Sequence, residues 1–138
     1  MFHRFLFFED KTLLIIRVYG RTDRMGIRSR IARFVSDPRW KSGYKVLVDY
    51  SRVTAIETPR GYFDTLESLL REIPEDRLPL GIAYVFPERL FHTYIDPILS
   101  MFHIQVGFHV SFFREEEEAL EWLEGLSPAP KTSAATPR

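Results

Sequence analysis

Two short runs of continuous apolar residues constrain the fold of this chain more than any other feature. Val46 to Val48 form the centre of YKVLVDY (44–50), and LGIAYVF (80–86) is apolar almost throughout. A strand with one exposed face alternates apolar and polar residues, whereas a strand covered on both faces is apolar at successive positions. Both segments are therefore predicted to be inner strands of a sheet that has helices on each side.

Helices and strands alternate around these two segments. A short turn at Asp10-Lys11 joins the first two strands, which we expect to form an antiparallel hairpin. The order β-β-α-β-α-β-α-β-α indicates one α/β domain over residues 1–126, with a mixed, mostly parallel five-stranded sheet and about four packing helices. The Pro-, Ala- and Ser-rich residues 127–138 are predicted to be a disordered tail. The predicted strands are 5–9, 12–19, 44–50, 80–86 and 105–113, and the predicted helices are 22–36, 58–73, 87–102 and 114–126.

The first predicted helix combines an apolar stripe with many arginines. Thr22 or Asp23 can cap it, and the helical spacing of the apolar residues gives one buried face. Arginines without exposed aromatic partners or a reading motif do not resemble a nucleic-acid site, so no nucleic-acid partner is predicted. The stripe is Ile27, Ile31, Phe34 and Val35, and the arginines expected on the other faces are Arg24, Arg28, Arg30 and Arg33.

The absence of cysteine, the lack of long apolar runs and the distribution of charge narrow the classes of function. The chain has 138 residues and no cysteine, which excludes disulfides, thiol catalysis and thiolate metal sites. No apolar run approaches the ~20 residues of a membrane span, and the N-terminus does not resemble a signal peptide, so a cytoplasmic protein is expected. Net charge is zero, but residues 1–60 carry 13 basic and 6 acidic residues. A dipolar surface that favours a charged partner is one interpretation, and charges scattered over solvated faces are the other.

Three stretches give the chain a resemblance to a known family. VLVDYSRVTAIET (46–58) resembles the core strand and phosphoacceptor loop of the bacterial SpoIIAA-like domains, also called STAS domains. The opening hairpin that ends at Tyr19-Gly20 and the segment FFREEEEALEWLEGL (112–126) are similar to the beginning and end of STAS/Sec14-type domains. The resemblance implies the STAS fold and a role as a regulatory or protein-interaction module.

The resemblance also places a phosphoacceptor position. Asp49 matches the aspartate at the end of the family's core strand, with Ser51 close behind it, Glu57 matches the loop aspartate, and Thr58 matches the phosphorylated serine. Pro59 and Arg60 depart from the small residue and the glycine that follow in the family. We interpret Thr58 first as the N-cap of the second helix, which is compatible with a phosphate at the same helix end.

Other chemistry is not predicted. The histidines at 3, 92, 103 and 109 have no partner at metal-ligand spacing, and no acidic cluster completes a metal set. Ser51, His92 and Asp49 could be combined on paper into a triad, but no nucleophile elbow supports one. We therefore expect no metal, no cofactor and no enzymatic activity.

The third helical region, LFHTYIDPILSMF (90–102), is apolar around nearly its whole circumference. Such a helix must be buried by something: the core of the domain, a second copy of the chain, or a ligand pocket that it walls. The resemblance to Sec14-type domains implies lipid-like ligands, so a pocket for a small apolar molecule is one expectation here, beside a homodimer face and burial in the core of the domain. The residues assigned to this interface or pocket are Phe91, Tyr94, Ile95, Ile98, Leu99 and Phe102.

Overall fold

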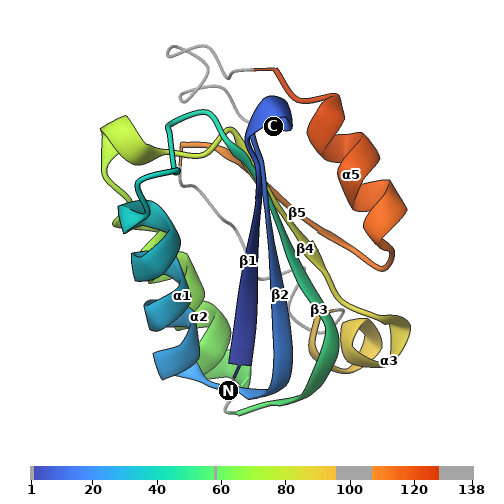
Figure 1. Ribbon diagram of the computed structural model, residues 1–138. Coiled ribbons are helices and arrows are strands. Elements are labelled where there is room, and N and C mark those ends of the chain that lie inside the picture. The colour runs from blue at the N-terminus through green and yellow to red at the C-terminus, as the bar shows by residue number, and fades with distance from the viewer. Residues whose placement is uncertain (1, 58, 96–106, 128–138) are drawn as a thin grey trace.

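The computed structural model describes residues 2–57, 59–95 and 107–127 of the chain. Its centre is a five-stranded sheet with the strand order β1-β2-β3-β4-β5 (Figure 1). β1 and β2 are antiparallel and the later pairs are parallel, which confirms the predicted mixed, mostly parallel sheet. The strands are β1 (Phe2–Phe8), β2 (Leu13–Thr22), β3 (Lys45–Ile56), β4 (Gly81–Val85) and β5 (His109–Phe113), and the helices are α1 (Arg24–Ser36), α2 (Pro59–Arg71), α3 (Glu88–Leu90) and α5 (Glu116–Glu124).

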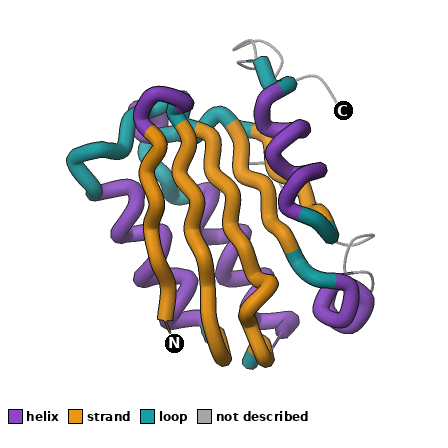
Figure 2. Tube along the Cα trace, turned by 45° about the vertical axis from the view of Figure 1, so that its right-hand side comes forward, coloured by secondary structure: helices purple, strands orange, loops and turns teal. Residues whose placement is uncertain are grey.

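Helices cover both faces of the sheet. α1 and α2 lie side by side on one face, and α5 lies on the other (Figure 1 and Figure 2). Because successive residues of a strand point to opposite faces, the apolar residues of β3 divide between two clusters. Val46 and Val48 pack in the larger cluster under α1 and α2, and Leu47 packs in the smaller one under α5. This division explains the continuous apolar run from which the fold was predicted.

α1 begins as the sequence indicates, with one correction to its buried face. Asp23 is the N-cap, and its side chain accepts a hydrogen bond of 2.9 Å from the backbone N–H of Gly26. Thr22 is not the cap, because it is the last residue of β2 and is buried. Ile27 and Phe34 are buried as predicted, but Arg30 is buried with them instead of lying on a solvent-exposed face.

β3 is longer than predicted. The sequence predicts a strand over residues 44–50, yet β3 continues through the polar segment 51–55 to Ile56. The register against β2 shifts twice. Arg17 pairs with Asp49 but Tyr19 pairs with Arg52, and Gly20 pairs with Val53 but Arg21 pairs with Ala55. Each bulge inserts one extra residue into β3, so the strand continues while the side chains after the bulge point to the opposite face of the sheet from the one that simple alternation would give. The segment that was interpreted as a loop is therefore the outer half of a strand.

The third helical region differs from a regular helix in its described part. α3 is a single turn, and it is followed by a π-helical turn over Phe91–Ile95. Residues 96–106, which include Asp96-Pro97 in the second half of the predicted helix 87–102, lie outside the described residues. The expected tail is likewise outside them, apart from Ser127. Within the described part of the chain, no helix is long and apolar enough to cross a membrane.

Candidate functional site

The face of the sheet under α5 changes from apolar to charged where the helix begins. Ile15 of β2 and Leu47 of β3 are buried beneath α5. Two residues further along each strand, on the same face, stand Arg17 and Asp49, which are direct partners in the parallel ladder. The change places polar side chains on the part of this face that α5 leaves uncovered.

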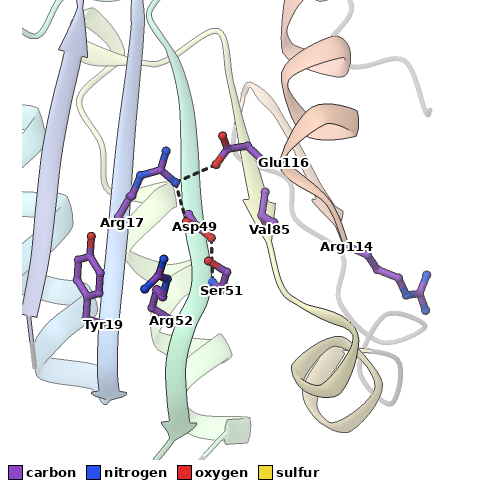
Figure 3. Close-up of a pocket in the computed structure, with 8 residues that line it drawn as sticks. All are labelled: Arg17, Tyr19, Asp49, Ser51, Arg52, Val85, Arg114 and Glu116. Carbon is purple, nitrogen blue, oxygen red and sulfur yellow. Dashed lines mark hydrogen bonds and ion pairs between the residues drawn. The ribbon is translucent and has the colours of Figure 1, made fainter.

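Arg17 joins three elements of the structure at this boundary. Its Nη1 atom lies 2.7 Å from Oδ2 of Asp49 on β3 and 2.8 Å from Oε1 of Glu116, the first residue of α5 (Figure 3). The hydrogen bond to Glu116, followed by that to Asp49, raises the pKa of the Arg17 guanidinium against the effect of burial. Asp49 is buried, and its Oδ1 also accepts a hydrogen bond of 2.8 Å from the backbone N–H of Ser51. One oxygen of the Asp49 carboxylate is thus bound by the Arg17 guanidinium and the other by the Ser51 backbone, which fixes its position.

Beside this ion pair lies a depression with a volume of about 360 Å³, which we call the sheet-face depression. A volume of this size is at the lower end of the range for small-molecule sites. Three guanidinium groups and two carboxylates line it, so its formal charge is positive by one. The lining residues are Arg17, Tyr19, Asp49, Ser51, Arg52, Val85, Arg114 and Glu116.

The first bulge of β3 determines which side chains reach the depression. It leaves Ser51 and Arg52, which are consecutive, both exposed and both in the lining. Arg89, directly after the start of α3, donates to the backbone oxygen of Val53 at 2.9 Å and to that of Ser51 at 3.4 Å. These bonds satisfy strand carbonyls near the bulge and hold it in place.

A second polar group lies inside the core on the opposite face of the sheet. We call Thr22, Arg30, Tyr50 and Tyr62 the buried arginine cluster. Nη2 of Arg30 donates to the hydroxyls of Tyr50 at 2.9 Å and Tyr62 at 2.8 Å, and the two hydroxyls also bond to one another. Thr22 accepts from Arg30 and contacts the Tyr62 hydroxyl at 3.3 Å. Burial, with a smaller effect of Tyr50, raises the pKa of Tyr62, so its phenol stays protonated.

Exposed side chains gather at the corner where β2 ends and α1 begins. Arg24, Met25 and Arg28 are exposed on the first two turns of α1, and the side chain of Met25 is 73% exposed. Arg21 at the end of β2 forms an exposed ion pair of 2.9 Å with Glu57. We call Arg21, Arg24, Met25 and Arg28 the basic corner.

The residues matched to the family's phosphoacceptor loop do not form one group in the described structure. Asp49 and Ser51 lie at the sheet-face depression, whereas Glu57 follows the end of β3 at the basic corner. Ile56 lies seven positions after Asp49 on β3, which corresponds to about 23 Å in an extended chain. Asp49 also lies within β3 and not at its end, because the strand continues beyond it. Thr58 lies outside the described residues.

The apolar residues proposed for an interface or pocket are only partly described. Phe91 and Ile95 are buried in the larger core cluster, and the half-buried Tyr94 packs against it. Their burial agrees with the core interpretation for this half of the region. Ile98, Leu99 and Phe102 lie outside the described residues, so the homodimer and the apolar pocket stay predictions.

Two polar residues of structural importance were not foreseen. Arg30 follows Ile27 by three positions and precedes Phe34 by four, so its spacing already placed it on the apolar stripe. Because arginine is charged, Arg30 was nevertheless assigned to the solvent-exposed faces of the helix. Arg17 stands in a β-branched strand where alternation places it on the face of Ile15, but nothing in the sequence shows where α5 stops covering that face.

Comparison with known proteins identifies the fold. The chain is similar to an uncharacterised protein from Shewanella loihica that has a SpoIIAA-like fold, with 14% identity, a TM-score of 0.51, and coverage of 88% of this chain and 91% of that one. It is also similar to the anti-sigma factor antagonist SpoIIAA in its unphosphorylated form (15% identity, TM-score 0.44, covering 90% and 99%). A third similar structure is an anti-sigma factor antagonist from Mycobacterium paratuberculosis (14%, TM-score 0.47, covering 88% and 94%).

The first of these likenesses shows that the chain has the SpoIIAA-like fold that the sequence resemblance implied. No protein-family model matches the sequence. No curated protein matches it either.

Proposed function

We propose that the protein is a non-catalytic interaction module of the SpoIIAA-like (STAS) type, which binds an acidic protein partner through its basic corner. The observation that carries this proposal is the exposure of Met25 among arginines. Large apolar side chains are mostly buried in the described structure, and Met25 is 73% exposed. Single exposed apolar residues are common, but methionine and arginine are both enriched in protein interfaces relative to the rest of the surface.

The geometry of α1 places these side chains on one surface. Arg24 and Arg28 are four positions apart and Met25 and Arg28 are three apart, so all three are neighbours on the helix. The flexible Met25 side chain can adapt to an apolar contact, while the arginines attract carboxylates and increase the rate of encounter. An acidic surface with a small apolar centre is the partner that fits this arrangement.

The chemistry of the corner favours binding over catalysis. Arginine stays charged at all physiological pH values, so it does not act as a general acid or base near neutrality. The exposed Arg21–Glu57 pair contributes little to stability, because water and salt screen such pairs. Arg21 can therefore exchange Glu57 for a carboxylate of the partner at small cost.

The proposal is tested by capture of binding proteins with tagged wild-type chain and three variants. Met25→Ser removes the apolar contact and Arg28→Glu reverses a charge at the basic corner. Lys41→Glu makes the same change of charge at an exposed position after α1 and is the matched control. A partner identified by mass spectrometry and then purified is expected to bind the wild-type and Lys41→Glu chains, and to bind the two corner variants at least tenfold more weakly. Equal binding by all four proteins would refute the basic corner as the binding surface.

Self-association through the third helical region is a separate prediction from the sequence. Sedimentation velocity of the wild-type chain and of Ile98→Asp tests it. A dimer that becomes a monomer in the variant would support the prediction, and a wild-type monomer would end it.

A further inference from the structure

We infer that the sheet-face depression binds the oxyanion group of a small molecule, a phosphate or a carboxylate, through Arg52, Ser51 and unused donors of Arg17. This site is distinct from the basic corner, and the inference does not depend on the proposed function. Its first support is the distribution of charge in the lining: both carboxylates are paired with Arg17, whereas Arg52 has no acidic partner among the described residues.

The distribution of hydrogen bonds strengthens this argument. Both carboxylates, Asp49 and Glu116, accept from the same Nη1 atom of Arg17. A guanidinium has five N–H donors, and those on Nε and Nη2 of Arg17 are not used by either carboxylate. They have no partner within the described part of the chain. The Asp49 carboxylate is buried and paired, and it therefore does not repel a second anion as strongly as a free carboxylate would.

Arg52 supplies the cation that is not neutralised. Its side chain is exposed, and no described residue forms an ion pair or hydrogen bond with it. The Ser51 hydroxyl beside it likewise has no partner among the described residues. Figure 3 shows Arg52 between Tyr19 and Ser51, on the side of the depression below Arg17.

Arg114, the third arginine of the lining, is engaged elsewhere. Its Nε lies 2.7 Å from Oε2 of Glu88, and its guanidinium stands 4.1 Å from the centre of the Phe91 ring. Figure 3 shows its side chain extending away from Arg17. Arg52 and Arg17 are thus the arginines that can converge on one anion.

The shape of the site favours a small oxyanion. Arginine side chains bind phosphate and carboxylate through paired N–H donors, and a neighbouring hydroxyl adds a third donor. The bulge of β3 is what brings Ser51 and Arg52 to the same rim, and bulges commonly re-aim side chains next to binding sites. Buried Val85 at the edge of the lining offers an apolar contact to the rest of the molecule.

The test is a titration of the ¹⁵N-labelled full chain with inorganic phosphate and, separately, with succinate at constant ionic strength. Constant ionic strength is needed because salt screens exposed charges. The expected result is a saturable change of the backbone amide signals of Ser51 and Arg52 with at least one anion. A response to phosphate alone assigns a phosphate group, a response to succinate alone assigns a carboxylate, and a response to neither overturns the inference.

Matched variants separate a site from a general attraction of anions. Arg52→Gln is expected to weaken binding by roughly tenfold, because charge-assisted hydrogen bonds are the strong ones, and Ser51→Ala to weaken it less. Arg4→Gln removes an exposed arginine that is the ladder partner of Arg17 but does not line the depression, and it should change the affinity by less than about twofold. Equal losses in Arg52→Gln and Arg4→Gln would overturn the inference, since a diffuse positive field would then explain the binding.

Discussion

Arg17 and Arg30 both link the central sheet to a helix, yet they do so in opposite ways. Arg30 reaches from α1 into the core, is 3% exposed, and bonds to the hydroxyls of Tyr50 and Tyr62. Arg17 reaches from β2 to the first residue of α5, has a side chain that is 30% exposed, and is paired with two carboxylates. One arginine is surrounded by protein on the closed face of the sheet, and the other borders a depression on the partly covered face.

The difference separates a structural role from a binding role. A buried cation needs its hydrogen-bond partners at all times, because water cannot replace them. A cation at an open surface can exchange partners with water or a ligand at little cost. The comparison therefore predicts that variants of the buried arginine cluster change stability strongly, whereas variants at the sheet-face depression change it less and alter anion binding.

The largest effect is expected for Arg30→Met. Methionine keeps most of the volume of the side chain but leaves the hydroxyls of the cluster without their charged donor. We expect the free energy of unfolding to fall by about 2 kcal/mol, measured by urea denaturation. Arg28→Met on the exposed face of the same helix is the control and should change it by less than about 0.5 kcal/mol. If both variants lose the same stability, the cluster does not stabilise the core.

A smaller loss is expected for Asp49→Asn. The variant keeps the shape of the buried side chain but removes the charge that Arg17 binds at 2.7 Å. Hydrogen bonds to charged groups contribute more than neutral ones, so a loss of about 1.5 kcal/mol is expected in the same denaturation experiment. A loss larger than that of Arg30→Met would reverse the proposed order of the two sites.

Glu116→Gln should cost less again. The side chain of Glu116 is 39% exposed, against 6% for Asp49, although both accept from the same nitrogen of Arg17. Exposed ion pairs contribute from zero to about 1 kcal/mol, so we expect a loss of about 0.5 kcal/mol or less by urea denaturation. A cost equal to that of Asp49→Asn would show that exposure does not separate the two carboxylates.

The weakest expected effect is a dependence of stability on pH through His3. Both ring nitrogens of His3 are buried without a hydrogen-bond partner among the described residues. Burial, followed by the nearby cations Arg30 and Arg33, lowers the pKa of His3 below its usual value of 6.5. As the pH falls below 6.5 the unfolded chain binds this proton more readily than the folded chain, so stability is lost.

Substitution by phenylalanine isolates this contribution. His3→Phe removes the titrating group, and its stability relative to the wild type should rise as the pH is lowered from 7 to about 5. Thermal denaturation of both proteins across this range gives the measurement. A constant difference between them at every pH would show that His3 does not titrate differently in the folded state.

The sequence predicted the strands, their succession along the chain and a mixed, mostly parallel sheet, because the inner strands are continuously apolar and the helices carry clear apolar stripes. It did not predict that β3 extends to Ile56. Ser51, Arg52 and Thr54 are exposed polar residues, and they end the apolar pattern although the backbone ladder continues through two bulges. Strand pairing depends on the neighbouring strand β2, which a local pattern does not contain.

The buried arginine cluster and the sheet-face depression were also not predicted, because their partners lie far apart in the sequence. The spacing of Arg30 relative to Ile27 and Phe34 pointed to the core, but its acceptors come from β3 and α2, far along the chain. The sheet-face depression depends on where α5 begins over the sheet and on the bulge that exposes Arg52. Both are properties of tertiary packing, so neither follows from residue types and periodicity alone.

The most direct test of the contrast between the two arginines is an NMR spectrum of their guanidinium groups with and without inorganic phosphate. The structure predicts that the Arg30 signals exchange slowly with water and do not move, because its guanidinium is enclosed in the core. The signals of Arg17 and Arg52 should exchange quickly and shift with phosphate in a saturable way. Rapid exchange of Arg30, or a shift of its signals equal to those of Arg17 and Arg52, would contradict the division into a structural and a binding arginine.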